Sequence, residues 1–502
     1  MSSALTSPFH GLPIEEAVPL AADLTELKQS SILQGRRRIR FQPQTGVAAQ
    51  AGQIVQFVLS DSTGLLDVNS MVLSGTIAVT GVPAGSTFSV VDEGAAIFRR
   101  VQVLANGSLI EDIDNCHRAA NMEILASAES DWYKHDGSFA NFWKFNETLS
   151  VGTATAQNDV VTHAQEISID LSGSALQVGW PLGLLAPSLR CNKYWPLRSM
   201  GELVLQFTMA NNQEAIWCDG VGSPVYTFND IFIECDIVVP HPSYASLLDR
   251  MTQLQSEPGL YLPVESRLVS QGQAIPGVTP SVGAEGETLT GVPTETNIVV
   301  SRATTNLRRV MYGVQPTAGL NNYAYPSVSC FPDAGCSAFQ VRVGSLYFPS
   351  QPANSLARMF YLTSAGFGEP ASTDKAAVYN RHNYDSTTLV NTNGAALAGY
   401  VYKQLPTTGG QFQGTLALAG AADTPILRFS YSDFAPKAHC FDSYKNTSAP
   451  LANDGISILG NSGSQLIVIA RHMNPEPVTP TIVLDATRVI VLKDGGLRIM
   501  GA

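Results

Sequence analysis

The sequence has little charge for its length. Only 14% of its 502 residues are charged, against about 25% in a typical soluble protein. The net charge is −12, whereas nucleic-acid binders need cationic surface to displace counterions from phosphates. These values argue against direct, sequence-specific binding of nucleic acid. They favour a polar, weakly charged surface that meets other protein more than water.

Long apolar runs and a secretory leader are also missing. No apolar run approaches the ~20 residues of a membrane span. The opening MSSALTSPFHGLPIEEAVPL has neither the basic start nor the continuous apolar centre of a signal peptide. We therefore expect synthesis in the cell interior without a signal peptide.

Cysteine is scarce and its count is odd. Of seven cysteines, several lie in strand-like runs, as Cys218 and Cys235 do, which predicts reduced, buried thiols. Cys330 and Cys336 are close enough in the sequence to bridge a loop, and the sequence leaves this pairing open. It also leaves open whether three Asn-x-Ser/Thr triplets are glycosylated, at Asn106, Asn146 and Asn446.

Motifs that carry chemistry do not occur. There is no phosphate-binding loop, no Gly-x-Ser-x-Gly elbow and no His-Glu-x-x-His helix. His439 and Cys440 are the one tight His/Cys pair, and two ligands fall short of the three or four that zinc needs. Glu15 and Glu16 are paired carboxylates in an N-terminal arm with no scaffold around them. The sequence predicts no catalytic, cofactor-binding or metal-binding residue, no cofactor, and no enzyme.

What the sequence does contain is strand patterning with frequent turns. Gly and Pro, 42 and 29 residues, punctuate runs of period two and short buried runs. One helix is predicted per half, beginning near Asn115 and near Asn354 or Ser355, the second ending at Gly366. This pattern of many short strands, frequent turns and one helix per half indicates two successive β-sandwiches. Strands are predicted at 53–60, 71–81, 98–110, 202–210, 226–240, 260–270, 297–315, 338–348, 415–420, 425–434, 464–472 and 481–500.

A duplicated stretch links the two halves. GSLIEDIDNCHRAANMEILASA (Gly107–Ala128) matches GSLYFPSQPANSLARMFYLTSA (Gly344–Ala365) at eight of 22 positions without a gap. Each copy follows an alternating strand. We expect the two stretches to be equivalent elements of two related domains, each running from a strand end through a loop into a helix. Chance similarity is the alternative.

Several phrases resemble double jelly-roll major capsid proteins. The stretch FQVRVGSLYFPSQPANSLARMFYLTSAGFG (339–368) is similar to the strand, Gly-x-x-aromatic-Pro-x-Gln-Pro turn and helix of that family. The stretches at 180–216 and 226–248 resemble the end of its first barrel and the exit helix. The resemblance points to virophages, polinton-like viruses and related double-stranded DNA viruses, and it spans roughly residues 37–500. Only the second copy carries the full phrase, since Asp112–Asn115 replaces the turn in the first.

The resemblance implies an all-β fold of two consecutive eight-stranded jelly-roll β-sandwiches, a double jelly roll, with short helices in the loops. It divides the chain into an N-terminal arm (1–34), a first jelly roll (35–255) and a second jelly roll (256–502). It implies self-assembly as pseudo-hexameric homotrimers into an icosahedral shell of a virion. Implied partners are further copies of the chain, minor capsid proteins and penton proteins, and an inner membrane is left open.

Two alternatives stay open at this stage. One is a two-domain carbohydrate-binding or glycan-degrading β-sandwich protein, for which the aromatic residues of 129–150 could line a sugar site. We favour a role for that stretch, and for the turn-rich loop at 271–296, in contacts within the chain or between subunits. The other alternative is a minor or vertex capsid protein, which the duplication disfavours.

The basic run GRRRIR has two interpretations. It is either an ordinary solvated strand start, or an inward-facing patch that contacts an acidic partner such as a minor capsid protein, lipid headgroups or genome. The candidate contact residues are Arg36, Arg37, Arg38 and Arg40.

Overall fold

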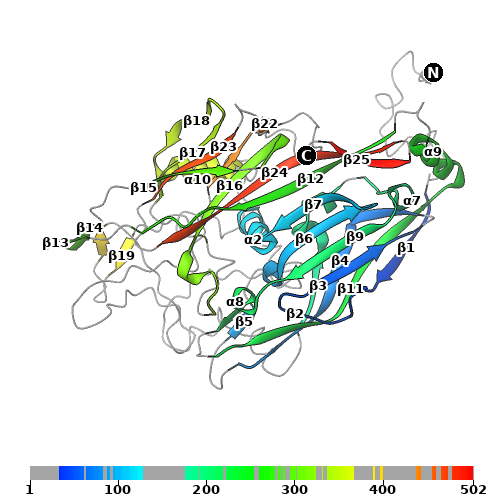
Figure 1. Ribbon diagram of the computed structural model, residues 1–502, viewed down its shortest axis with the longest axis horizontal. Coiled ribbons are helices and arrows are strands. Elements are labelled where there is room, and N and C mark those ends of the chain that lie inside the picture. The colour runs from blue at the N-terminus through cyan, green and yellow to red at the C-terminus, as the bar shows by residue number, and fades with distance from the viewer. Residues whose placement is uncertain are drawn as a thin grey trace, which may run out of the picture.

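The computed structural model places two β-sandwiches side by side (Figure 1). The residues that it describes are 33–61, 64–82, 88–90, 94–127, 176–191, 193–218, 222–253, 259–277, 281–283, 286–288, 294–300, 302–323, 331, 336–366, 388–390, 396–398, 437–441, 455–458, 465–472, 477–493 and 495–500. The expected arm lies outside them except for Leu33 and Gln34, which belong to the first strand.

The first sandwich is built from residues 33–240. One of its sheets has the order β1-β11-β4-β8, with β2 also on β11, and the other has the order β3-β9-β6-β7. A short pair, β5 and β10, stands apart. The strands are β1 (Leu33–Phe41), β2 (Ala49–Gln50), β3 (Ile54–Leu59), β4 (Leu65–Thr80), β5 (Phe88–Val90), β6 (Phe98–Ala105), β7 (Ser108–Asp114), β8 (Leu176–Pro181), β9 (Leu203–Met209), β10 (Ile216–Cys218) and β11 (Val225–Pro240).

The second sandwich is built from residues 260–500. Its sheets have the orders β12-β24-β16-β21, with β22 on β16 and β25 on β24, and β15-β23-β17-β18. The strands are β12 (Leu260–Gln271), β13 (Ser281–Gly283), β14 (Gly286–Thr288), β15 (Thr294–Val300), β16 (Thr304–Pro316), β17 (Cys336–Val343), β18 (Leu346–Ala353), β19 (Thr388–Val390), β20 (Ala396–Ala398), β21 (Lys437–Cys440), β22 (Ile456–Ile458), β23 (Leu466–His472), β24 (Val478–Lys493) and β25 (Gly496–Met500).

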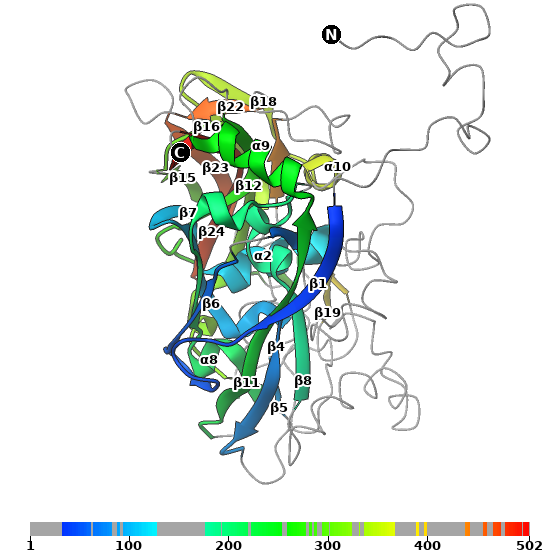
Figure 2. The same ribbon diagram turned by 90° about the vertical axis from the view of Figure 1, so that its right-hand side faces the viewer.

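Helices are short and lie in the connections (Figure 2). Helix α2 follows β7, helix α10 follows β18, and helix α9 links the two sandwiches. The helices are η2 (Gly94–Ile97), α2 (Cys116–Ser127), α6 (Leu182–Leu185), η3 (Pro187–Leu189), α7 (Leu197–Met200), α8 (Asn212–Ala215), α9 (Pro242–Gln253), η4 (Thr317–Gly319) and α10 (Leu356–Gly366).

The two sandwiches have the same topology. Eight main strands of each, numbered in chain order, pair as 1-8-3-6 in one sheet and 2-7-4-5 in the other. The set is β1, β3, β4, β6, β7, β8, β9 and β11 in the first sandwich, and β12, β15, β16, β17, β18, β21, β23 and β24 in the second. Two antiparallel four-stranded sheets in this order form a jelly roll. The predicted all-β double jelly roll with short helices is confirmed.

The duplicated stretch marks equivalent positions. In each barrel a tight turn joins strands 4 and 5, and a helix follows strand 5. The first turn uses Asn106 and Gly107 at φ values of 47° and 73°, and the second uses Gly344 at 59°. Positive φ at these positions gives the turn the twist that a hairpin needs. The run 98–110, predicted as one strand, is therefore the hairpin β6–β7.

One detail of the expected motif is wrong. The Pro-x-Gln-Pro phrase, Pro349–Pro352, was expected as a turn but lies within strand β18. Because β18 is an edge strand of its sheet, its prolines need not donate ladder hydrogen bonds. The strand, with no intervening loop, leads almost directly into α10, as β7 leads into α2.

The helix starts differ in how they are capped. Ser355 accepts a hydrogen bond from the Arg358 N–H at 3.3 Å, as predicted for an N-cap. Asn115 instead has φ of 53°, and its backbone carbonyl accepts from Arg118 and Ala119. Its side chain bonds Asp114 and Arg118 instead. Other predictions, the strands at 415–434 and the aromatic stretch at 129–150, lie outside the described residues.

Candidate functional site at the junction of the barrels

Helix α2 of the first barrel packs on the outer face of the β12-β24-β16 sheet of the second (Figure 1). Every residue from Asn115 to Ile124 is buried. The tip of Met122 lies over Gly313 on β16, where an added Cβ would come within 2.7 Å of both Met122 Cε and Phe331 Cδ1. A glycine is therefore needed where this helix approaches the sheet.

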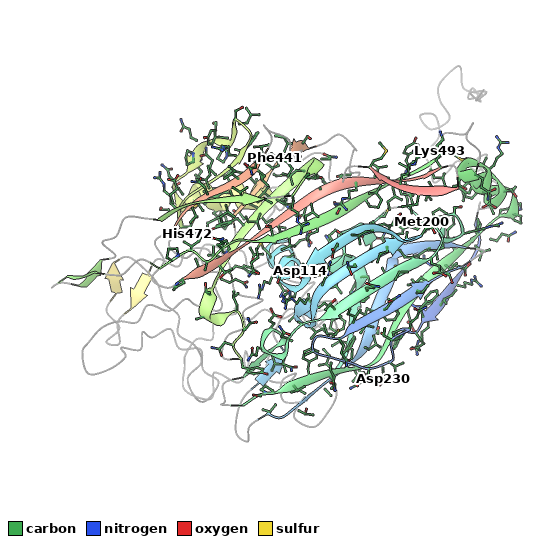
Figure 3. The ribbon with its side chains drawn as sticks, viewed as in Figure 1. Asp114, Met200, Asp230, Phe441, His472 and Lys493 are labelled. Carbon is green, nitrogen blue, oxygen red and sulfur yellow. The ribbon has the colours of Figure 1, made fainter. Side chains whose placement is uncertain are left out.

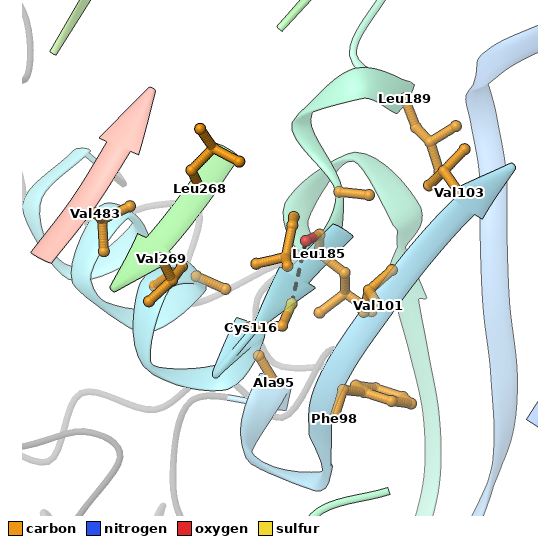
Figure 4. Packing of buried hydrophobic residues seen from close by; sticks show 14 of the residues in the cluster. Ala95, Phe98, Val101, Val103, Cys116, Leu185, Leu189, Leu268, Val269 and Val483 are labelled. Atoms are coloured by element: carbon orange, nitrogen blue, oxygen red, sulfur yellow. Dashed lines mark hydrogen bonds between the residues drawn. The ribbon is translucent and has the colours of Figure 1, made fainter. Parts of the chain in front are cut away.

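Apolar packing continues across the junction without a break. Buried apolar side chains of both barrels form a single cluster. In Figure 4, Val269 and Val483 of the second barrel lie beside the helix that Cys116 begins, and the Cys116 thiol donates to the Leu185 carbonyl at 3.2 Å. The two barrels are therefore held together by apolar packing between them as well as by the connecting helix.

A buried carboxylate stands at the centre of this junction. Glu123 on α2 accepts from Arg190 of its own barrel at 2.8 and 2.9 Å. It also accepts from two arginines of the second barrel, Arg267 on β12 at 2.8 Å and Arg309 on β16 at 3.3 Å. Glu123 thus ties both barrels together through charge-assisted hydrogen bonds.

A second carboxylate completes the network from the other side. Asp485 on β24 accepts from Arg267 at 2.8 Å and from Arg309 at 2.9 Å. Burial by itself would raise the pKa of Glu123, but Arg190, Arg267 and Arg309 outweigh it and hold this pKa well below its usual range. At Asp485 burial likewise favours a higher pKa, but the charges of Arg267 and Arg309 outweigh it, so that the pKa of Asp485 is also lowered. Both carboxylates are ionised at neutral pH.

A third carboxyl group, that of Glu111, contacts the edge strand β12 of the second barrel. It lies on β7 and accepts from the backbone N–H of Arg267 at 2.6 Å and of Ser188 at 3.0 Å. Burial raises its pKa, and the hydrogen bonds from Ser188 and Arg267 only partly offset that rise. This carboxyl group therefore accepts one outward-facing N–H of the edge strand β12, which adjoins the first barrel.

Such a network serves orientation more than stability. A buried ion pair gains little over apolar packing, but removing one partner leaves an uncompensated charge. Sliding or tilting one barrel would separate Glu123 from Arg267 and Arg309. The junction therefore fixes the two barrels in one relative arrangement.

The predicted arginine patch lies elsewhere, on the edge strand β1. Each arginine side chain is about half exposed, from 49% to 56%. Each has an acidic partner within the first barrel: Arg36 pairs with Asp67 and Asp236, Arg37 with Asp61, and Arg38 and Arg40 with Glu234. Arg40 also lies 3.7 Å over the ring of Phe232.

These ion pairs change the character of the patch. Four guanidinium groups face four carboxylates of the same barrel, so the surface is not a free positive field. The contact of this surface with a partner remains a prediction.

Sequence reasoning missed the junction residues. Glu123, Arg267, Arg309 and Asp485 lie far apart in the chain, and no spacing links them. One signal was available: Arg267 and Asp485 are charges within apolar strand runs, where an unpaired charge would be costly.

A hollow of about 770 Å³ lies on the outer face of the β15-β23-β17-β18 sheet. Its charged lining residues are Glu295, Arg342, Arg358 and Arg471, and Tyr347 adds an aromatic ring. Glu295 is paired with Arg471 at 2.6 Å. The hollow brings together no pair of carboxylates.

Within the described residues, no cluster of three metal-ligating side chains occurs. His439 packs between Phe348 and Phe441, and burial lowers its pKa to about 4. Cys116, Cys191 and Cys235 are buried free thiols. Cys330 lies outside the described residues, and the sequence had left its pairing with Cys336 open.

Figure 3 shows the side chains of both barrels, with Asp114 at the end of β7 and His472 at the end of β23. Over the part of the chain that the structure describes, no helix is both long and apolar enough to cross a membrane.

The sequence matches no protein-family model. It also matches no curated protein.

Solved structures are similar over nearly the whole chain. A chain of the Sputnik virophage structure aligns with a TM-score of 0.53 and 10% identity, covering 93% of this chain and 89% of that one. A chain of the PBCV-1 virus capsid aligns with a TM-score of 0.50 and 10% identity, covering 93% of this chain and 97% of that one. The mavirus major capsid protein aligns with a TM-score of 0.47 and 9% identity, covering 100% of this chain and 96% of that one. The fold comparison rests on the Sputnik and PBCV-1 chains. The chain therefore has the double jelly-roll fold found in these chains of the Sputnik virophage and the PBCV-1 capsid.

Proposed function

We propose that this protein is the major capsid protein of a DNA virus, a structural protein without catalytic activity. The observation that carries the proposal is the pair of topologically identical barrels held in one orientation by the Glu123 network. Two equivalent barrels in one fixed orientation are what a tile of a closed shell needs.

The mechanism is geometric. Three chains in a closed ring present six similar barrels, and therefore a pseudo-hexagonal outline that can tile a shell. Cyclic closure of identical contacts is the usual way in which homo-oligomers form. The rigid junction matters because any freedom between the barrels would blur this outline.

The further assembly follows from the same proposal. Trimers would contact one another in an icosahedral lattice, with minor capsid and penton proteins as further partners, and the protein would reside in the virion. The domain division at 1–34, 35–255 and 256–502 belongs to this proposal. The basic strand Arg36–Arg40 is its candidate contact surface.

The carbohydrate alternative has less support. Glycan hydrolysis needs two carboxyl groups facing one another across a cleft, and the hollow on the second barrel contains one, Glu295, engaged with Arg471. A minor or vertex capsid protein has no need of two equivalent barrels in one chain.

Light scattering on the purified protein tests the proposal. A trimer has a mass of about 161 kDa, three times 53.6 kDa. The interface should be large and obligate, burying more than ~2,000 Å², so the trimer should persist at micromolar concentration. A protein that stays as single chains or pairs would contradict the capsid proposal and favour the carbohydrate-binding alternative.

A further inference from the structure

The hollow on the outer face of the β15-β23-β17-β18 sheet is more cationic than the chain around it. Its charged lining residues are three arginines, Arg342, Arg358 and Arg471, and one acid, Glu295. The whole chain, by contrast, has a net charge of −12. The volume of about 770 Å³ falls within the ~300–1,000 Å³ of ordinary ligand sites. The hollow is therefore a candidate site for an anionic ligand.

Two of the three arginines have no acidic partner among the described residues. The Arg358 guanidinium donates to the carbonyls of Gln351 and Pro352, at 3.2 Å each. The Nε of Arg342 is buried and has no hydrogen-bond partner in the described part of the chain, and buried polar atoms of this kind are rare in native proteins. An anionic ligand in the hollow would give both guanidinium groups the carboxylate that they lack.

The fold itself does not require a cation at this place. In both barrels a tight turn joins strands 4 and 5, and the second residue pair from that turn can be compared directly. This pair is Leu104–Leu109 in the first barrel and Arg342–Tyr347 in the second. Because the two barrels have the same topology, folding alone does not explain why a cation and an aromatic ring replace two leucines.

Apolar groups lie beside the cations. Ala338 and Ile469 line the hollow together with Tyr347, which is 44% exposed. Val299 lies two strands away from Arg342 in the same cross-strand row and is 48% exposed. This surface suits a ligand that has both acidic and apolar parts.

We propose that the hollow binds an acidic segment of a partner protein, an extended stretch in which Asp or Glu residues alternate with apolar ones. The planar fork of a guanidinium matches a carboxylate with two parallel hydrogen bonds. Arg342 and Arg358 each take one carboxylate, and the apolar side chains of the segment cover Ile469 and Tyr347. The inference goes beyond the proposed capsid function and does not depend on it.

Other anions fit the hollow less well. A free phosphate or sulfate ion would use neither the apolar lining nor most of the volume. Nucleic acid needs many cations along its backbone, and this hollow offers two that are free of an acidic partner among the described residues. Charge and apolar surface together favour a polypeptide.

Fluorescence anisotropy on the full-length protein tests the site. The probes are two fluorescein-labelled octapeptides, one of four Glu-Leu repeats and one of four Gln-Leu repeats, which have nearly the same shape and differ in charge. The Glu-Leu peptide should bind about tenfold more tightly or better, because only carboxylates form charge-assisted pairs with the arginines.

Variants locate the binding in the hollow. Arg358→Gln should weaken binding of the Glu-Leu peptide about tenfold. Arg342→Leu/Tyr347→Leu gives the second barrel the residues of the first, so it should keep its thermal midpoint and bind the peptide at least as weakly. Arg100→Gln is the control: Arg100 lies on strand 4 of the first barrel and is paired with Asp112, and its loss should leave the affinity unchanged.

The outcomes separate this inference from the capsid proposal. Equal affinity for the two peptides, or an affinity that Arg358→Gln does not lower, overturns the inference, and so does an equal loss in Arg100→Gln. Binding that disappears whenever light scattering shows trimers also overturns it, because a second copy then fills the hollow. None of these results changes the mass of the assembled protein, on which the capsid proposal is judged.

Discussion

At the scale of single residues, Glu123 is the side chain on which the arrangement of the barrels depends most. It accepts hydrogen bonds from three arginines, one of its own barrel and two of the second. Glu123 is buried, with 8% of the residue exposed, so salt screens its ion pairs only weakly.

Replacing this carboxylate should be costly. Glu123→Gln leaves Arg267 and Arg309 with reduced compensation, and removal of one partner from a buried pair costs about 3–5 kcal/mol. Urea unfolding should report this loss. Glu295→Gln is the matched control, because its pair with Arg471 is about half exposed and such pairs contribute about 0–1 kcal/mol. Equal losses in both variants would contradict the assigned role.

The same network predicts sensitivity to acid. The pKa values of Glu123 and Asp485 are lowered in the folded protein, so their stabilisation is present above the ordinary carboxyl pKa of about 4 and is lost as pH falls through the lowered values. Glu111, with its raised pKa, acts in the opposite sense. Urea midpoints measured from pH 7 to pH 2 should fall below about pH 4. Glu123→Gln should show a shallower decline, and an unchanged slope would count against the network.

At the scale of elements, helix α2 and the basic strand β1 illustrate two kinds of contact. The helix is buried against a sheet through a glycine, and the strand is exposed and paired with acids on its neighbours. The contact of α2 belongs to the folded chain itself. The exposed strand β1 is available for contacts with other molecules.

Crowding at Gly313 should loosen the first contact. A Cβ there meets Met122 Cε and Phe331 Cδ1 at 2.7 Å each, and overpacking of this kind costs about 1–3 kcal/mol. Gly313→Ala should therefore lower the thermal midpoint. The double variant Gly313→Ala/Met122→Ala should lose less stability than the sum of the losses in the two single variants. Strict additivity would show that the helix tip and the glycine do not interact.

Strand β1 should matter for assembly more than for folding. Changing Arg36, Arg37 and Arg38 to Ser removes exposed ion pairs, so stability should stay within about 1 kcal/mol of the original. Trimer and particle yield should drop if this strand contacts a partner. Normal particles from this variant would reduce the strand to a solvated sheet edge.

Elements could be predicted from sequence where local rules decide them. Period-two runs located strands, Ser355 and Gly366 bounded α10, and the duplication identified α2 and α10 as equivalent helices of the two barrels. Pro349–Pro352 was misread because its place on an edge strand is a tertiary fact. The junction network was out of reach for the same reason: Arg190, Arg267, Arg309 and Asp485 meet Glu123 only after both barrels have formed.

At the scale of the whole molecule, the two barrels share a topology but differ in what covers them. The β12-β24-β16 face is buried by α2, while the equivalent β1-β11-β4 face carries half-exposed ion pairs. A head-to-tail ring is built from two different free surfaces on each chain, and the open β1-β11-β4 face is available as one of them. The low overall charge of 14% suits repeated protein contacts.

Negative-stain electron microscopy of the purified protein tests this account most directly. Class averages should show a ring of six lobes with threefold symmetry, because each chain contributes two similar barrels in fixed orientation. Two-lobed particles, or rings of four lobes, would contradict the claim that the protein is a pseudo-hexameric building block.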